Sequence, residues 1–442
     1  MARTVGVLRR PRPRVIFVKS LPIQNPTSAA EHGGADKSFA VGHEATAGAP
    51  RRPRRTRRRR RRVAVAPLFD RVAVAPLGLP EEIMVWEIFV RLAAKDILRC
   101  RSVCLSWRGL TSAPDFLLAH HQRQPSLPLV ALYGVHGILP IFERGRPVLG
   151  FDDGEDFKVH SSCDGLLLLS LSDGSFSICN PATRQCAPLA GLTAAKHIDF
   201  AVLYPHHPSG EYRVLYSEKR QPYQIKSAAY YILMVQQRGS SRCVGVPSDT
   251  HAMEEATSAG THGMAPHNLA PPILFRRCLH WEPDRFYHRN PVIVVFDTMV
   301  ESFKFMRRPA DVTTFCTQMC HIEGSIGLGS FADGKTALKI WVLEDYEREV
   351  WSLKYHVTFP VTSLCDLANT KHLVLSPKGD VLVYNMSKYH MFHCDNTGKL
   401  IEEFRLESES RGLSIIGHSF KESLVKHEFF PRRAVPNIFG RL

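Results

Sequence analysis

The feature that most constrains this fold is a series of short alternating segments between residues 128 and 430, separated by turn residues. HLVLSPKGDVLVYNMSKYHMFHCDNTGKLIEEFRL (residues 372–406) predicts four strands, with turns at Pro377-Lys378-Gly379, near Met386-Ser387 and at Asn396-Thr397-Gly398. CDGLLLLSLSDGSFSICNPATRQ (residues 163–185) predicts further strands around an Asp173-Gly174 turn. Because such short turns join antiparallel neighbours, we predict one large all-β domain over residues 128–430.

The number of short strands favours a closed architecture. About five antiparallel groups follow one another with almost no predicted helix between them. We therefore predict a β-propeller of roughly six blades, because radial closure leaves only short, protected strand edges. A large sandwich or an open barrel is the alternative. Residues 239–272 are rich in Ser, Thr, His, Gly and Pro, which predicts a flexible insertion between strands.

A helical module precedes the β domain at residues 77–122. Pro80 and the two glutamates after it suit the first turn of a helix, Lys95–Arg101 repeats a helical apolar pattern, and Pro114 opens another short helix. The predicted class is therefore α+β multidomain, a small helical module followed by a large all-β domain. About 45 residues is near the size below which a domain rarely supports itself, so we expect a protein partner on its apolar surface.

The first 76 residues carry most of the net charge. They contain 18 of the 57 Lys and Arg residues and only four acidic residues, a net charge of +14 in a chain of net charge +15. Ten arginines lie within RRPRRTRRRRRR, Arg51–Arg62. This Arg/Pro-rich composition predicts a disordered tail that serves as a nuclear import signal, binds polyanions without sequence preference, or has no function.

Cysteine usage and hydropathy indicate in which cellular compartment the protein is located. The 11 cysteines are an odd number without a Cys-x-x-Cys pair, which predicts reduced thiols rather than a disulfide framework. No apolar run approaches the roughly 20 residues that span a bilayer, so we predict no membrane association. With the arginine run, these features predict a location in the nucleus, the cytoplasm or both.

No motif predicts catalysis, a cofactor or a metal. GSFADGKT (Gly329–Thr336) matches a phosphate-loop pattern, but the alternating residues after it predict a hairpin strand where nucleotide binding requires a helix. Two Cys/His groups lack the second ligand pair of a zinc site, and we interpret them as core residues. These groups are Cys316 with Cys320-His321, and His390 with His393-Cys394.

LPEEIMVWEIFVRLAAKDILRCRSVCLSWRGL (residues 79–110) resembles an F-box. Several features of the family pattern fall in order along it. They are Leu79-Pro80, Ile83, Glu87-Ile88, Arg91-Leu92, Lys95-Asp96-Ile97-Leu98-Arg99, Val103-Cys104 and Trp107. Ala93 stands where the family usually has Pro, so we expect the first helix to run on by a turn.

The β region resembles the F-box-associated domains of plant F-box proteins, many of which are propeller-like. The similar pieces are DGLLLLS, ICNPATRQ, HPSGEYRVLYS, LHWEP, VFDTMVESFKFM, WVLEDYEREVWS and HLVLSPKGDVLVYN. Together the two resemblances imply a non-catalytic substrate-recognition subunit of an SCF ubiquitin ligase, whose β domain recruits a target protein for ubiquitination. The alternative is a nuclear protein that associates with nucleic acid through the Arg-rich tail.

The resemblance also implies partners. The F-box would bind a Skp-type adaptor and, through it, a cullin scaffold, whereas the target protein is unknown. Val103, Cys104 and Trp107 are expected to divide between the adaptor interface and the core of the module. The full set of residues implied for adaptor binding is Leu79, Pro80, Ile83, Ile88, Leu92, Ile97, Leu98, Val103, Cys104 and Trp107.

Overall fold

The structure is a computed structural model that describes part of the chain. The described residues are 16–19, 79–132, 157–171, 173–192, 198–218, 229–236, 241–245, 271–282, 292–312, 317–322, 324–332, 336–359, 370–374, 379–385, 390–405 and 413–430. The arginine run Arg51–Arg62 lies outside them. The predictions of an import signal and of a disordered tail there therefore stay predictions.

The helical module is built from short helices. They are α1 Glu81–Ile83, continued by a π-helical turn (η1, Met84–Ile88) and a 3-10 turn (η2, Phe89–Arg91), then α2 Ala94–Cys100, α3 Leu105–Leu110 and α4 Pro114–Arg123. The expectation that the first helix runs past Ala93 is wrong. Leu92 and Ala93 are extended, with ψ angles of 155° and 151°, so the helix ends without a proline. No helix within the described residues is long and apolar enough to span a bilayer.

The helices enclose a small apolar core. Val90 and Ile97 are fully buried in it. Trp107 of α3 packs edge-on against Phe89, with 4.9 Å between the ring centroids. Leu424, from the far end of the chain, is buried in the same cluster. The core of this module is therefore not supplied by residues 77–122 alone.

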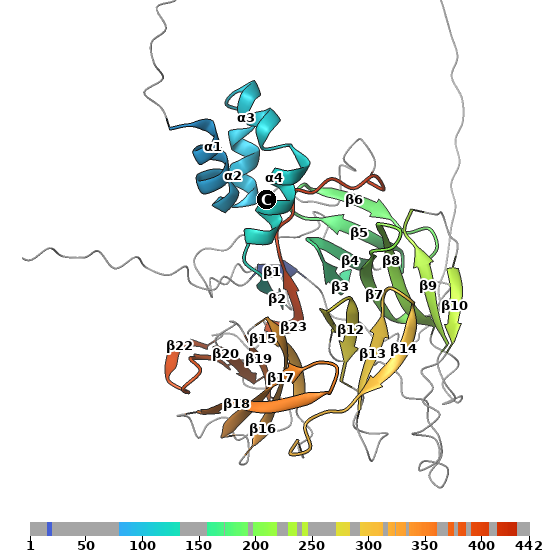
Figure 1. Cartoon of the computed structure of the whole chain (residues 1–442), viewed down its shortest axis with the longest axis vertical. Coiled ribbons are helices and arrows are strands. Elements are labelled where there is room, and N and C mark those ends of the chain that lie inside the picture. Colours follow the sequence, from blue (N-terminus) through green and yellow to red (C-terminus); the bar gives the residue numbers. More distant parts are fainter. Residues whose placement is uncertain are drawn as a thin grey trace, which may run out of the picture. The chain divides into compact units, whose positions relative to one another are not determined.

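Within the described residues, five antiparallel sheets of four strands follow (Figure 1). The first contains β3 Phe157–Cys163, β4 Leu166–Leu171, β5 Phe176–Asn180 and β6 Gln185–Pro188. The second contains β7 Ile198–His206, β8 Glu211–Glu218, β9 Tyr230–Met234 and β10 Ser241–Gly245. The third contains β11 Ile273–Phe275, β12 Cys278–Trp281, β13 Ile293–Asp297 and β14 Ser302–Met306.

The last two sheets have the same order. The fourth contains β15 Thr317–Ile322, β16 Ser325–Ala332, β17 Ala337–Asp345 and β18 Val350–Thr358. The fifth contains β19 Thr370–Val374, β20 Val381–Asn385, β21 His390–Cys394 and β22 Leu400–Arg405. These four strands of the fifth sheet are the four that the sequence predicts between residues 372 and 406.

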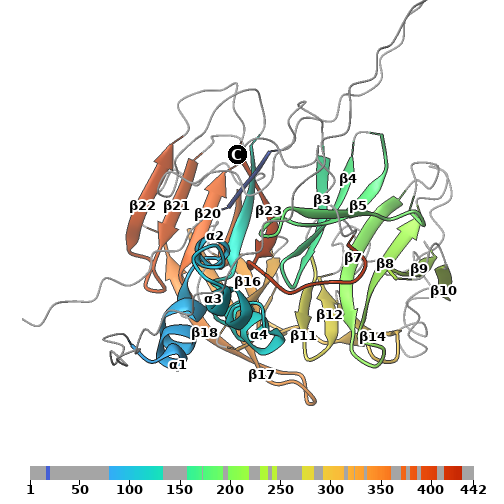
Figure 2. The same ribbon diagram turned by 90° about the horizontal axis from the view of Figure 1, so that it is seen from above.

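The five sheets are the blades of a β-propeller (Figure 2). Within each blade the strands pair in chain order. β3 contacts β7, β11 contacts β15 and β15 contacts β19, so first strands of successive blades are neighbours. Apolar clusters join successive blades, as where Trp281 packs edge-on against Phe200. The predicted propeller is confirmed, and the described part of the chain forms five four-stranded blades instead of the predicted six or so.

A three-stranded sheet joins the two ends of the β domain. β2 (Leu127–Leu132) follows α4 and pairs antiparallel with β23 (Leu413–Phe420), which also contacts β3 of the first blade. β1 (Ile16–Lys19) pairs parallel with the other edge of β2. The prediction of disorder is therefore wrong for residues 16–19, because an open strand edge accepts a short apolar strand from the tail.

The predicted insertion at residues 239–272 also needs a correction. Ser241–Gly245 forms β10, which pairs with β9 at the edge of the second blade. Its side chains are exposed or half-buried, and the five residues SRCVG show no alternation of apolar and polar residues that would predict a strand. Residues 246–270 lie outside the described residues.

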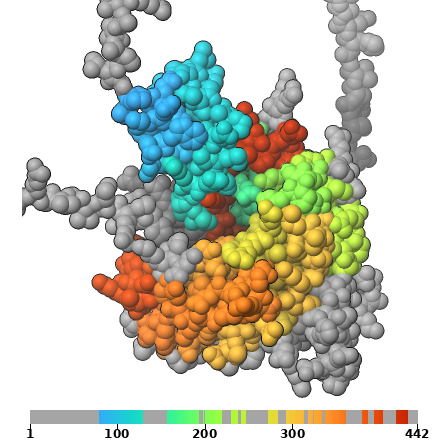
Figure 3. All heavy atoms as spheres, viewed as in Figure 1, coloured from blue at the N-terminus to red at the C-terminus, as the bar shows by residue number. Residues whose placement is uncertain are grey.

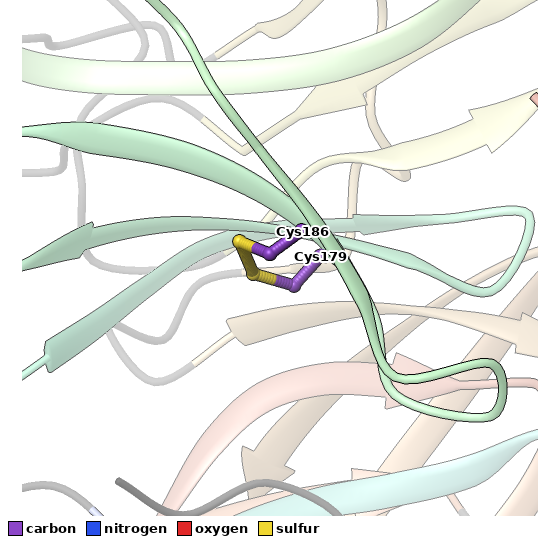
Figure 4. Close-up of a disulfide and its surroundings, with 2 residues drawn as sticks. All are labelled: Cys179 and Cys186. Atoms are coloured by element: carbon purple, nitrogen blue, oxygen red, sulfur yellow. A yellow bond between two sulfur atoms is a disulfide. The ribbon is translucent and has the colours of Figure 1, made fainter. Parts of the chain in front are cut away.

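Cys179 and Cys186 form a disulfide between β5 and β6 (Figure 4). Hairpin pairing places the two residues directly opposite each other, with Cα atoms 4.2 Å apart. The prediction of reduced thiols is therefore wrong for this pair, while the other described cysteines are free. A separation of seven residues gives no sequence signal, because only the strand register aligns the two side chains.

A buried carboxylate links the second and third blades. Glu301, in the β13–β14 turn, accepts hydrogen bonds from Tyr204 Oη at 2.6 Å, from Arg213 Nη1 at 2.6 Å and from Arg242. Its side chain is only 3% exposed. Burial alone would raise the pKa of Glu301, but the three donors outweigh it and hold the pKa below the ordinary value of 4.5.

We predict that Glu301→Gln destabilises the propeller at neutral pH and has a much smaller effect in acid. A carboxylate with a lowered folded pKa stabilises the fold above its unfolded pKa, and this contribution is lost as the pH falls through the folded value. Urea unfolding at pH 7 should show a loss of roughly 1–3 kcal/mol, which shrinks near pH 3. Glu402→Gln, at an exposed position of β22, is the control. An equal loss at both pH values would contradict the assignment.

Candidate functional site

Exposed apolar side chains concentrate on the helical module. Of the 13 large hydrophobic residues that are exposed within the described residues, nine lie between Leu79 and Leu118. Isolated exposed hydrophobic residues are normal, but a concentration of them marks a site of interaction. We call these nine residues the apolar helix surface. They are Leu79, Ile83, Trp86, Ile88, Leu98, Val103, Leu105, Leu110 and Leu118.

Most of the residues implied for partner binding lie at the surface. The seven exposed ones are Leu79, Pro80, Ile83, Ile88, Leu98, Val103 and Cys104. Leu92 and Trp107 are half-buried, and both pack against the core of the module. Ile97 is 0% exposed, so its side chain lies in the core of the module, and its part in adaptor binding stays a prediction. Because successive residues of a helix point in different directions, Ile97 faces the core of the module while its neighbour Leu98 faces outward.

The sequence missed part of the apolar helix surface. Leu105 is the most exposed of the nine residues, at 81%, yet it was not predicted. It begins α3, a helix of six residues, and apolar periodicity cannot assign a face in so short a helix. Trp86, Leu110 and Leu118 were also missed, because the sequence there is apolar on more than one side.

Polar contacts fix α3 against the rest of the module. Cys104 precedes α3, and its Sγ accepts a hydrogen bond from the Trp107 amide at 3.4 Å. Ser106 Oγ donates to Glu81 Oε1 at 2.7 Å, which ties α3 to α1. Arg101 Nη2 donates to the carbonyl oxygen of Thr111 at 2.6 Å. These contacts hold the exposed Val103 and Leu105 in a defined place.

Charged side chains on the same helices pair with each other. Arg91 lies 2.6 Å from Glu87, and Arg99 lies 3.2 Å from Asp96. All four side chains are about half or more exposed, so the pairs contribute little to stability. Burial lowers the pKa of Arg101, whose guanidinium lies partly inside the module. The module therefore combines an apolar surface with neutralised charge pairs, which suits a protein partner rather than a polyanion.

The phosphate-loop pattern lies on a hairpin. Ala332 ends β16 and pairs with Ala337, the first residue of β17. The segment after the pattern is a strand, as the sequence predicts, so no helix N-terminus is available there for a phosphate. Asp333–Lys335 themselves lie outside the described residues.

Two cysteines of the Cys/His groups, Cys320 and Cys394, lie in the propeller core. Cys320 and Cys394 belong to one apolar cluster between the fourth and fifth blades. Burial raises the pKa of Cys320 to about 12 and that of Cys394 to about 11, which disfavours the thiolate that a metal binds. Within the described part of the chain, no three His, Cys, Asp or Glu side chains are grouped to hold a metal. Cys316 lies outside that part.

A buried histidine of the third blade is likewise engaged in structural contacts. His280 Nδ1 lies 3.2 Å from the Ile273 carbonyl oxygen, and Nε2 lies 2.9 Å from Tyr346 Oη. Burial lowers the pKa of His280 to about 4, so the ring is neutral near pH 7. The neutral ring then donates to the carbonyl and accepts from the tyrosine, and neither nitrogen remains for proton transfer.

Two family models match this chain. The family model described as "F-box associated beta propeller domain" matches residues 151–413, and the model described as "F-box-like" matches residues 77–121. The second match covers α1 to α3, most of α4 and all nine residues of the apolar helix surface. The first match covers all five four-stranded blades.

Relatives in Arabidopsis thaliana are similar to this chain over most of its length. F-box protein At1g30790 is 21% identical over 368 residues, which cover 73% of this chain and 88% of the relative. F-box protein At5g18160 is 25% identical over 313 residues, which cover 67% and 75%. Among solved structures, a gluconolactonase from Xanthomonas campestris covers 64% of this chain and 88% of its own, at 10% identity and a TM-score of 0.33. So weak a likeness says nothing about function.

We predict that Ile97→Ala and Leu98→Ala, one position apart, differ sharply in their effect on stability. Loss of the buried Ile97 side chain should lower the free energy of unfolding by roughly 2–5 kcal/mol, because it leaves a cavity. Loss of the exposed Leu98 side chain should change it by less than about 0.5 kcal/mol. Urea unfolding followed by circular dichroism at helix wavelengths measures both. Equal effects would show that the inward and outward faces of α2 are wrongly assigned.

Proposed function

Because the chain belongs to the F-box-associated β-propeller family and carries an F-box-like segment before the propeller, we propose that it is the substrate-recognition subunit of an SCF ubiquitin ligase. In this proposal a Skp-type adaptor, held by a cullin scaffold, binds the helices, while the propeller binds the target protein. The apolar helix surface is the observation that carries the proposal. Nine exposed hydrophobic residues on so small a module call for a partner that covers them.

The proposed role needs binding and positioning rather than catalysis by this chain. A receptor that holds a target near a charged ubiquitin-conjugating enzyme raises the effective concentration of the target's lysines, so that transfer becomes effectively intramolecular. The buried side chains described above fit this role, because His280 and Cys320 are occupied or protonated. We therefore propose a non-catalytic subunit without a cofactor.

The location of the protein follows as part of the same proposal. Arg51–Arg62 has the composition of a nuclear import signal, and SCF ligases act on proteins inside the cell. We propose the nucleus, the cytoplasm or both. The target in this proposal is a protein that the propeller binds.

The adaptor interface is tested with variants of exposed residues. We expect replacement of Leu79 and Pro80 together by Ala, or Leu98→Glu alone, to weaken binding of a purified Skp-type adaptor more than about tenfold, because buried interface anchors carry most of the binding energy. Calorimetric titration of the full chain measures the affinity. Circular dichroism establishes that each variant is folded.

A matched control comes from the propeller. Leu353 on β18 is 50% exposed, so Leu353→Glu introduces the same charge at an exposed leucine outside the helices. We expect its affinity for the adaptor to stay within about twofold of the unchanged chain. Adaptor binding that survives both helix variants would overturn the proposed interface. Failure of the unchanged chain to bind the adaptor would overturn the proposed function.

A further inference from the structure

The segment that follows β23 packs against the helical module. Lys421–Val425 runs past α4, as the red segment beside the cyan helix shows in Figures 1 and 3. Lys421 Nζ donates to the Gln122 carbonyl oxygen at 2.8 Å, and His121 Nδ1 donates to the Glu422 carbonyl oxygen at 2.8 Å. We call residues 421–425 the C-terminal latch.

Glu422 supplies a cap that α2 lacks. Ala93 occupies the N-cap position of α2 and has no side chain that could accept a hydrogen bond. The Glu422 carboxylate accepts one from the Ala94 amide at 2.8 Å, across 328 residues of sequence. A carboxylate at this end of a helix satisfies a free amide and interacts favourably with the helix dipole. α2 therefore depends on a group from the end of the propeller.

The two residues after Glu422 are buried between the helices and the first blade. Leu424 is 1% exposed and belongs to the apolar core of the helices. Ser423 is 0% exposed, and its carbonyl oxygen accepts a hydrogen bond from Asn180 Nδ2 of β5 at 3.0 Å. A Cβ on Gly165, whose φ is +81°, would lie 2.3 Å from the Cβ of Ser423. Only glycine permits the β3–β4 turn to approach the latch so closely.

The latch is continuous with β23, the strand that pairs with β2 and contacts the first blade. β23 pairs with β2, and β2 follows α4 directly along the chain. The helices are therefore connected to the three-stranded sheet in two ways. The chain runs directly from α4 into β2, and the latch that follows β23 packs against the helices. When two elements share such contacts, order in one stabilises order in the other.

We propose that the C-terminal latch is a structural part of the adaptor-binding module, so that adaptor binding to the helices and pairing of β23 with β2 beside the first blade stabilise each other. The proposal rests on the proposed function for the identity of the partner. Glu422 and Leu424 are positioning residues in it, because they act through α2 and the helix core and do not touch the adaptor. Coupling of this kind lets adaptor binding stabilise the domain that holds the target.

Hydrogen exchange of the full chain, with and without a Skp-type adaptor, tests the coupling. Glu422→Ala should speed exchange of the Ala94–Cys100 amides about fivefold, the usual factor for a lost helix cap. Glu428→Ala is the control, because Glu428 is an exposed glutamate six residues farther along the same segment. It should leave these rates unchanged.

The adaptor provides the second measurement. In the unchanged chain and in Glu428→Ala, adaptor binding should slow exchange in residues 413–425 as well as in the helices. In Glu422→Ala the helices should still respond, while the response of residues 413–425 should be lost or strongly reduced. Leu424→Ala should likewise reduce the response of residues 413–425. If Leu424→Ala does not fold, Glu422→Ala still tests the coupling.

Two results would overturn the coupling. One is unchanged exchange of α2 in Glu422→Ala. The other is an adaptor that slows exchange in the helices of the unchanged chain but not in residues 413–425. Failure of the adaptor to bind the unchanged chain is a different result, because it rejects the proposed function. Exchange of α2 in the free protein then still tests whether Glu422 caps this helix.

Discussion

Antiparallel pairing of β2 with β23 is the interaction on which the rest of the structure depends. It places Leu127, just after the helices, opposite Phe420, just before the latch. The blades are made of consecutive strands, and β2, before the first blade, pairs with β23, after the fifth. This pair belongs to the three-stranded sheet, and β23 leads directly into the latch that packs against the helices. The propeller and the helical module are thus completed by the same few residues.

The size of the helical module explains why it needs this help. A module of about 45 residues buries too little apolar surface to be stable alone, and here its core takes in Leu424 from the far end of the chain. Its first helix is broken into π-helical and 3-10 turns, and α2 receives its cap from Glu422. What the core does not bury remains on the apolar helix surface, which is available to a partner.

Sequence reasoning found the elements better than it found the contacts between them. Turn residues such as Gly379 and Gly398 have positive φ angles, and the strands they separate lie where alternation predicts them. The same reasoning did not separate the buried Ile97 from the exposed Leu98, because in a helix with several apolar sides only packing decides which side is buried. It also missed the Cys179–Cys186 disulfide and the outer strand β10. Both depend on which strand lies alongside, and a short, exposed edge strand without apolar alternation resembles a loop.

The amino-acid sequence by itself determined the local rules of this protein: short alternating strands, tight turns, an F-box-like pattern in the helices and a nearly neutral body behind a basic tail. These features follow from side-chain periodicity and turn preferences, which act over a few residues. Only the tertiary structure decided that five blades form, that Glu301 joins two of them, and that Glu422 and Leu424 complete the helices. Those decisions rest on contacts between residues far apart in sequence, and no local pattern specifies such a pair.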